Sequence, residues 1–305
     1  MKPTIKDFVQ KQKLKPTKVE IKGKVTIITT KQGTYCLKRK DPTRSSPSEL
    51  HIYEYLNSRS FYYYPKVLEF SDDEIEVREY IREDHLPREQ KMVDLIDLMS
   101  LLHNKTTHYK EVDLDDYKKI YEDLRNNIIY LTSYYNDLIS VIDESIIMSP
   151  KEYLLARNCS MIFKSLYFCE VELEHWYEMI KEKRKQRVVV LHNNLQLSHF
   201  LRNENSYFIN WEKAKIGIPI FDFYKLYRAH ALEFDFQELL RRYEHRYPLK
   251  KEERLLLFIM ISMPEKIEFN DSEMKCCEMI SHRIDELYKA KDLRSPYQAE
   301  KTKQH

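Results

Sequence analysis

The chain has 305 residues, a formal charge of +2 at pH 7, 42% hydrophobic residues and 33% charged residues. These values are typical of a soluble globular protein with one large domain or two lobes, and the near-neutral charge argues against nucleic acid as a partner. The sequence has no run of about 18 apolar residues and no apolar signal-peptide core at its start. It therefore predicts a cytoplasmic protein without a membrane span.

Cysteine and glycine usage excludes several kinds of site. The 5 cysteines are an odd number without CxxC spacing, so we expect reduced thiols. Only 3 glycines are present, and phosphate-binding loops of the GxGxxG or GxxxxGK type need more glycines at fixed positions. The glycine elbow of serine hydrolases is absent as well, which disfavours a hydrolase.

The first part of the chain reads as a small α+β unit over residues 1–81. Gly23 and Gly33 mark two turns between segments with strand-like alternation. Ser48 is a suitable N-cap for the helix that follows. The expected elements are three short antiparallel strands within 17–40, a helix at 48–57, and strands at 65–68 and 76–80.

The remainder, residues 82–291, is expected to be a larger and mostly helical lobe, because its apolar residues recur at helical spacing. The tail at 292–305 is polar and is predicted to be disordered. The expected helices lie at 92–103, 115–145, 150–183, 221–247, 250–262 and 271–290, interrupted by a strand pair at 188–191 and 206–210.

The stretch 188–227 carries the chemistry: VVVLHNNLQLSHFLRNENSYFINWEKAKIGIPIFDFYKLY. Its layout resembles the "HGDxxxxN … IDWE … GxPxxDLxxLY" core of the aminoglycoside phosphotransferase and choline kinase families. The resemblance covers most of the chain. It implies a two-lobed, protein-kinase-like α+β fold with a small β-rich N-lobe and a large helical C-lobe.

Three polar positions depart from that pattern. Asn194 stands where the family has its catalytic aspartate, next to the loop residue His192. A neutral amide cannot accept the proton of a substrate hydroxyl, and loss of a general base typically costs about 10²–10⁴-fold. His199 and Asn210 stand where the resemblance implies the metal-binding asparagine and aspartate.

The exchanges also remove the expected metal ligands. Mg²⁺ prefers charged oxygen ligands, whereas imidazole suits softer metals, so these exchanges disfavour binding of Mg²⁺. Glu212 is the acid left nearby. A zinc site built from His103, His192 and His199 with the cysteines is an alternative that the sequence disfavours, because no paired ligand motif is present.

Other positions fit the family's frame. Lys38 lies in a "Y-x-L-K" strand, which implies contact with nucleotide phosphates, and Glu49 matches the family's helix glutamate better than Glu54 does. The resemblance places an adenine-binding hinge at Glu79, Tyr80 and Ile81, and a loop-fixing aspartate at Asp222.

The segment 243–264, YEHRYPLKKEERLLLFIMISMP, is similar to the CotS spore-coat branch of the family. That resemblance implies a bacterial protein with a role in the spore coat or envelope. Acceptor specificity in this fold comes from the variable helices around 105–180, so the sequence names no substrate.

Two functions follow from this pattern. The favoured one is a pseudokinase, a binding or scaffold protein whose cleft takes a nucleotide such as ATP, or a small polar ligand, through Lys38 without Mg²⁺, and which has a protein partner. The alternative is an active ATP-dependent small-molecule kinase with a rearranged site that uses Glu212 or Glu204.

Overall fold

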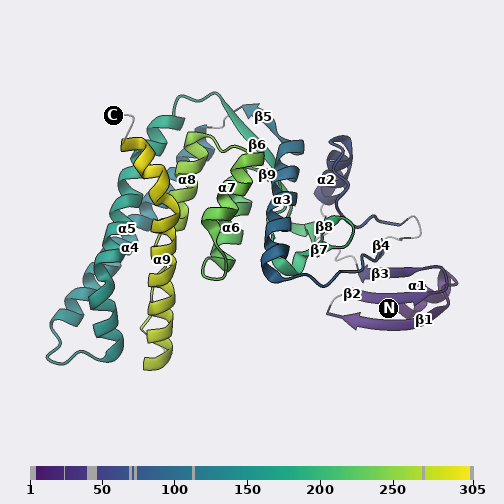
Figure 1. Ribbon diagram of the computed structural model, residues 1–305, viewed down its shortest axis with the longest axis horizontal. Helices are drawn as coiled ribbons and strands as arrows, with labels where there is room; N and C mark the ends of the chain where they lie inside the picture. Colours follow the sequence, from purple (N-terminus) through teal and green to yellow (C-terminus); the bar gives the residue numbers. More distant parts are fainter. Residues whose placement is uncertain are drawn as a thin grey trace. The chain divides into compact units, whose positions relative to one another are not determined.

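The computed structural model describes residues 5–23, 25–39, 47–68, 71, 74–111, 114–269 and 272–302 (Figure 1). Its contacts divide the chain into two compact units. The first consists of Met1–Thr106 with Val190–Ile216, and the second of Thr107–Val189 with Gly217–His305. Each unit is therefore built from two separate stretches of sequence. The lobe boundary at residue 81 stays a prediction.

The first unit is built on a four-stranded antiparallel sheet of order β1-β2-β3-β4. Its strands are β1 (Pro16–Lys22), β2 (Val25–Thr30), β3 (Thr34–Arg39) and β4 (Ile75–Glu79). The three strands expected within 17–40 are confirmed, and Gly23 makes the β1–β2 turn with a φ of +59°. The strand expected at 65–68 is reduced to one bridge between Val67 and Arg78, flanked by hydrogen bonds from Leu68 N–H to the Val77 carbonyl and from Glu79 N–H to the Lys66 carbonyl.

One face of this sheet forms a hydrophobic core under a short helix, α1 (Ile5–Lys11), that the sequence analysis missed. Phe8 of this helix packs in a buried cluster with Ile28, Leu37 and Val77. The pattern of the first residues gave no signal, because one turn of apolar spacing is too short to indicate a helix.

The other elements of the first unit are helical segments and a hairpin. Helix α2 (Pro47–Ser58) confirms the helix expected at 48–57. Helix α3 (Arg88–Thr106) buries Leu95, Ile96 and Met99 completely and contains the helix expected at 92–103. The hairpin strands are β7 (Phe200–Arg202) and β8 (Ser206–Phe208), flanked by the 3₁₀ turns η1 (Leu197–His199) and η2 (Trp211–Lys213).

The second unit is helical. In Figure 1 the long helices run side by side, and α5 packs against α4, α8 and α9. Trp176 and Leu173 of α5 are each 1% exposed, as expected for a helix covered on several sides. Its helices are α4 (Leu114–Asp143), α5 (Pro150–Ile180), α6 (Ile220–His230), α7 (Phe236–Arg246), α8 (Lys251–Ser262) and α9 (Glu273–Thr302).

The strand pair expected at 188–191 and 206–210 does not form. Strand β6 (Lys185–Leu191) lies between β5 (His108–Glu111) and β9 (Lys215–Gly217), whereas β8 pairs with β7. The apolar run of β6 predicts a buried strand correctly, but the pairing partner of a short strand is fixed by tertiary packing and not by its own sequence.

The tail expected to be disordered from Asp292 is instead helical as far as Thr302, where the described residues end. Leu293 is 2% exposed, and the Arg294 guanidinium stacks 3.8 Å from the ring centroid of Phe168 and donates to Ser262 Oγ at 2.5 Å. Tyr297 packs on Phe258. These long aromatic and aliphatic stems bury apolar surface although the segment is polar overall.

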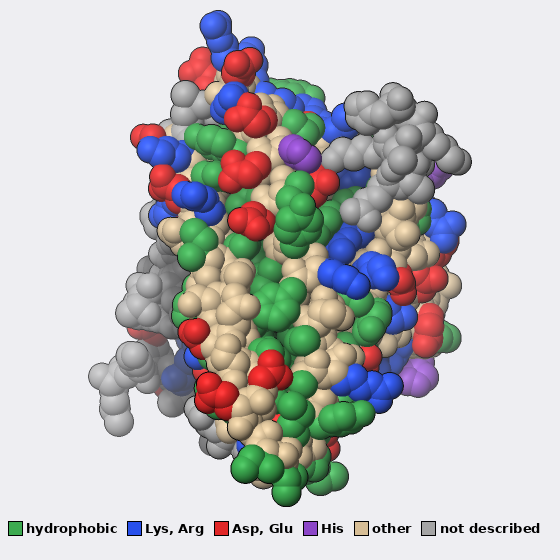
Figure 2. Space-filling view, turned by 90° about the vertical axis from the view of Figure 1, so that its left-hand side faces the viewer, with side chains coloured by type: hydrophobic (Ala, Val, Ile, Leu, Met, Phe, Trp, Pro, Cys, Tyr) green, Lys and Arg blue, Asp and Glu red, His purple; other side chains and the backbone are tan. Residues whose placement is uncertain are grey.

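Figure 2 looks onto the side of the helical unit that carries α4, α5 and α9, and shows apolar side chains gathered at its lower end. In the connection between α4 and α5, Ile146 and Ile147 are 100% and 86% exposed. Among the described residues, no helix combines the length and apolar composition needed to cross a bilayer.

Candidate functional site

The loop that follows β6 begins with a buried histidine. His192 is 0% exposed, and its Nε2 donates a hydrogen bond to the carbonyl oxygen of Ile209 at 2.9 Å. Its ring lies 4.8 Å from the ring of Trp211 and 5.3 Å from that of Phe208. His192 therefore ties the loop to the end of strand β8 and acts as a structural residue.

Asn193 occupies the position at which the resembling families have glycine. Its φ is 60°, in the left-handed region that asparagine tolerates better than most side chains. Its Nδ2 donates to the carbonyl oxygen of Lys213 at 2.8 Å. The tight turn is thus kept without glycine, and the added side chain ties the loop to the end of η2.

Asn194 and His199 are connected through the backbone. The Nδ1 of His199 donates to the carbonyl oxygen of Asn194 at 2.7 Å, because a carbonyl can only accept. This bond fixes the orientation of the imidazole and leaves Nε2 as the acceptor nitrogen when the ring is neutral. The side chains of both residues are half-buried.

The β7–β8 hairpin brings His199 and Asn210 to one of its ends. The backbone N–H of Ile209 donates to the carbonyl oxygen of His199 at 3.0 Å, and Asn210 follows directly. Asn210 has φ 64° and ψ 55°, a conformation that asparagine and aspartate adopt more readily than other side chains. The backbone at Asn210 therefore suits asparagine or aspartate, and asparagine supplies a neutral side chain there.

Trp211 anchors the segment between Asn210 and Glu212. It is 1% exposed, and its Nε1 donates to the carbonyl oxygen of Phe208 at 2.9 Å. Its ring makes edge contacts with surrounding aromatic rings, which are those of Tyr53, Phe61, Tyr64, His192 and Phe208. Such edge-to-face packing fixes the backbone on both sides of the indole.

Lys38, the predicted phosphate-binding residue, already forms an ion pair within the site. The Nζ of Lys38, on β3, forms an ion pair with Oε1 of Glu212 at the start of η2. Their side chains are 30% and 39% exposed, so the pair is reached by solvent. Sequence reasoning selected both residues but missed their pairing, because no local pattern relates a strand lysine to a glutamate so far along the chain.

Next to Lys38, Cys36 lies on the same face of β3, and burial raises the pKa of its thiol. Arg78, opposite Cys36 on β4, donates from Nη1 to the Tyr53 hydroxyl at 2.6 Å. Burial alone lowers the pKa of Arg78, but Tyr53 and Glu76 outweigh it and raise the pKa. This region is therefore a structural polar layer between the sheet and α2.

The remaining predicted site residues are placed differently. The side chain of Glu49 lies outside the described residues, although its backbone belongs to α2. Glu79 ends β4, and its N–H donates to the carbonyl oxygen of Lys66 at 3.1 Å. Tyr80 and Ile81 follow β4 without regular structure. Asp222 is fully buried in the first turn of α6, in the second unit.

No group of three or more histidine, cysteine, aspartate or glutamate side chains suited to a metal ion occurs among the residues that the structure describes. His199, Asn210 and Glu212 also fit Mg²⁺ poorly as a donor set. The first offers an imidazole nitrogen, the second a neutral amide, and the carboxylate of the third is paired with Lys38.

Comparison with known proteins gives structural relatives only. No protein-family model matches the chain, and no curated protein has a significantly similar sequence. Among solved structures, an aminoglycoside phosphotransferase from Alicyclobacillus acidocaldarius is similar over 93% of this chain and 93% of its own, with a TM-score of 0.63 and 11% identity. The chain has the fold of an aminoglycoside phosphotransferase.

Two further structures extend this comparison. Spectinomycin phosphotransferase APH(9)-Ia, solved in complex with AMP, has a TM-score of 0.52 and 12% identity, and the match covers 91% of this chain and 94% of that one. Choline kinase LicA from Streptococcus pneumoniae has 16% identity over 92% and 97% of the two chains, with a TM-score of only 0.49. The two aminoglycoside phosphotransferase matches, with TM-scores of 0.63 and 0.52, confirm the predicted kinase-like fold with a small antiparallel sheet and a large helical part.

Proposed function

We propose that this chain is a degenerate phosphotransferase, a pseudokinase that acts as a binding or scaffold protein. The observation that carries the proposal is the ion pair between Lys38 and Glu212. In the kinase-like fold this strand lysine neutralises nucleotide phosphates. Here the carboxylate of Glu212 takes the place of the phosphates beside Lys38. A polyphosphate must therefore displace Glu212 before it reaches Lys38.

The loop supports the same proposal, because its backbone is held in place while the residue at the expected base position is a neutral amide. His192 and Asn193 hold the loop by hydrogen bonds to Ile209 and Lys213. Asn194 has no basic lone pair near neutral pH and cannot take a proton from a hydroxyl. A scaffold that positions a neutral amide where a base is needed favours binding over phosphoryl transfer.

The proposed ligand is a nucleotide or a small polar molecule, bound without Mg²⁺. One structural neighbour is solved with AMP, and the residues at the expected metal position do not fit Mg²⁺. We extend the proposal to a protein partner in the spore coat or envelope of a bacterium. The alternative location in this proposal is the cytoplasm. That extension is supported by the similarity of 243–264 to the CotS branch.

Thermal unfolding with and without ATP tests the proposal. We expect either no shift or a shift that Mg²⁺ and Mn²⁺ leave unchanged. A ligand present at 100 times its Kd stabilises by about 2.7 kcal/mol, which is readily measured. Glu212→Gln removes the competing carboxylate and is expected to increase the ATP-induced shift, because Lys38 becomes available to phosphate.

Two matched variants complete this experiment. Glu122→Gln removes the same charge from an exposed ion pair with Lys118 that neither proposal uses, and is expected to leave the ATP response unchanged. Adding Lys38→Met to Glu212→Gln is expected to abolish the ATP-induced thermal shift of the Glu212→Gln variant. Turnover of ATP with a small hydroxylated acceptor, lost in Asn194→Ala, would contradict the pseudokinase proposal.

One observation favours the second candidate, a working small-molecule kinase with a rearranged site. The Nδ1 of His199 donates to the carbonyl oxygen of Asn194, and this bond leaves Nε2 of the same imidazole as a proton acceptor. In that case phosphoryl transfer to a hydroxyl is metal-dependent and is lost in His199→Asn, whereas the ATP-induced thermal shift of the variant persists.

A further inference from the structure

Strand β1 forms the outer edge of the four-stranded sheet. Within the residues that the structure describes, it pairs only with β2, in the register that places Val19 opposite Ile28 and Ile21 opposite Thr26. In Figure 1 its other side borders no labelled strand of that sheet. Backbone N–H and C=O groups on such an edge are a template for a further strand.

The apolar layer of the sheet continues onto this edge and is left uncovered there. Directly opposite residues of an antiparallel pair share one face, so Val19 and Ile21 lie on the face that holds the core residues Ile28 and Leu37. Ile28 and Leu37 are 1% and 0% exposed, whereas Val19 and Ile21 are 55% and 78% exposed. In the described part of the chain, the buried cluster includes residues of β2, β3 and β4 but none of β1, so Val19 and Ile21 stay exposed.

We propose that β1 pairs in antiparallel fashion with β1 of a second copy of this chain, joining the two sheets across a two-fold axis. Such a contact is self-complementary, as most homodimer interfaces are. The apolar faces stay aligned only if odd-numbered residues lie opposite odd-numbered residues. Val19 then lies opposite the partner's Val19, and Ile21 lies opposite the partner's Thr17.

The charges on the other face select this register. Lys18 lies opposite the partner's Glu20, and Glu20 opposite the partner's Lys18, so the two ion pairs of the separate chains become one alternating group of four charges. Centring the pair on Glu20 instead sets two glutamates against each other, and centring it on Lys18 sets two lysines against each other. Centring it on Ile21 also sets Glu20 opposite Lys22, but Val19 then faces Gly23, beyond the end of β1, whereas centring on Val19 pairs the strand over its full length. Like charges directly opposite are destabilising.

Lysine on an edge strand ordinarily opposes strand addition. Here Lys18 and Lys22 flank Glu20, so the edge repels an unrelated basic strand and accepts its own copy. The pairing covers one strand edge and two apolar side chains per copy, which places it among the small interfaces. A concentration-dependent dimer is therefore expected, rather than an obligate one.

Sedimentation of the full chain over a wide concentration range tests the proposal. We expect a monomer–dimer equilibrium that weakens at least tenfold in Lys18→Glu and in Glu20→Lys, because each variant sets like charges opposite each other. A mixture of the two single variants is expected to regain dimers, since each introduced charge then faces its complement. The double variant Lys18→Glu/Glu20→Lys is expected to associate as the unmodified chain does.

The register itself is tested by crosslinking under mild oxidation. Val19→Cys is expected to form a covalent dimer, because the two introduced thiols face each other, whereas Ile21→Cys is expected to remain uncrosslinked. Circular dichroism confirms that each variant is folded, since these side chains are exposed. A chain that stays monomeric to its solubility limit, or a dimer that both single variants retain, overturns the proposal.

Discussion

Arg187→Gln is expected to lower the free energy of unfolding by about 3–5 kcal/mol, because removing one partner of a buried ion pair leaves the other charge unpaired. The side chains of Arg187 and Glu253 are only 11% and 6% exposed. Urea unfolding followed by circular dichroism measures the change through the shift of the midpoint.

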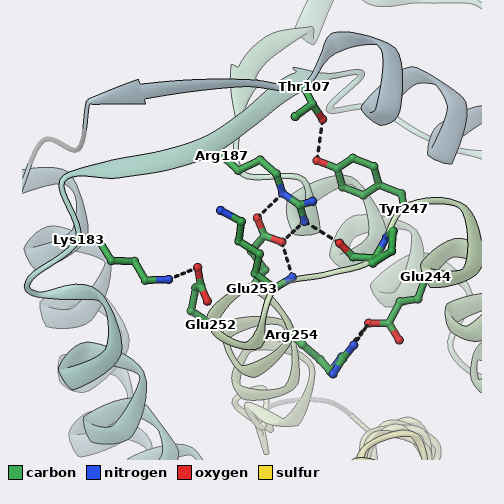
Figure 3. Close-up of polar contacts among 10 residues, drawn as sticks. Thr107, Lys183, Arg187, Glu244, Tyr247, Glu252, Glu253 and Arg254 are labelled. Atoms are coloured by element: carbon green, nitrogen blue, oxygen red, sulfur yellow. Dashed lines mark hydrogen bonds and ion pairs between the residues drawn. The ribbon is translucent and has the colours of Figure 1, made fainter.

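The geometry of this pair explains the size of the effect (Figure 3). The guanidinium donates to Glu253 through both Nε, at 2.9 Å, and Nη2, and it donates to the Pro248 carbonyl oxygen at 3.0 Å. It also lies 4.4 Å from the ring centroid of Tyr247, whose hydroxyl contacts Thr107 Oγ1 at 2.9 Å. Burial lowers the pKa of Arg187, but Glu253 outweighs it and raises the pKa, so the cation persists.

Two further variants show whether the loss of stability comes from burial of the Arg187–Glu253 pair. Lys118→Gln breaks an exposed i,i+4 pair with Glu122 and is expected to change stability by at most about 0.5 kcal/mol. The double variant Arg187→Met/Glu253→Met is expected to recover part of the loss, because no buried charge remains. It recovers only part, since Glu253 also accepts from the Lys250 N–H at 2.9 Å. A loss under 1 kcal/mol in Arg187→Gln would show that the pair is not buried in solution.

Trp211→Ala is expected to destabilise the first unit by about 3–5 kcal/mol, the range found when large buried aromatics are truncated. The indole is 1% exposed and lies in an aromatic cluster with His192 and Phe208. Because it sits between Asn210 and Glu212, its loss is also expected to abolish any ATP-induced thermal shift. Both effects are measured in the same unfolding experiment.

Trp211→Phe keeps a ring but loses the Nε1 donor to the Phe208 carbonyl, so we expect a smaller cost of about 1–3 kcal/mol. Tyr62→Ala, at a 54% exposed ring of the same region, is expected to stay within about 0.5 kcal/mol. Equal losses in Trp211→Ala and Tyr62→Ala would refute the cluster as the source of the stability.

The sequence predicted those elements whose pattern is long or repeated. The strands within 17–40 and the long helices α4 and α5 follow from alternation and helical spacing, and they are confirmed. The short helix α1, of only 7 residues, and the partners of β6 were not predictable in this way. They depend on which surfaces remain to be covered once the longer elements have packed.

The site shows the same limit. Family-like spacing selected Lys38 and named Glu212 as the acid left near the expected metal position, but it did not predict that the two form an ion pair. Ion pairs across a fold carry no local signature, so sequence alone could not find this one. Asn193 is a different case: it stands where the family pattern has glycine, and its left-handed φ of 60° is one that asparagine adopts more readily than most side chains.

The interleaving of the two compact units has a consequence for synthesis. The first unit needs Val190–Ile216, which leaves the ribosome only after all of Thr107–Val189 has been made. At about 5–20 residues per second, the stretch from Thr107 to Trp211 takes roughly 5–21 s to synthesise, so the sheet and α3 wait that long for the β7–β8 hairpin and Trp211. During that interval the apolar side of α3 lacks its hairpin, so this nascent chain offers chaperones a long and predictable window for binding.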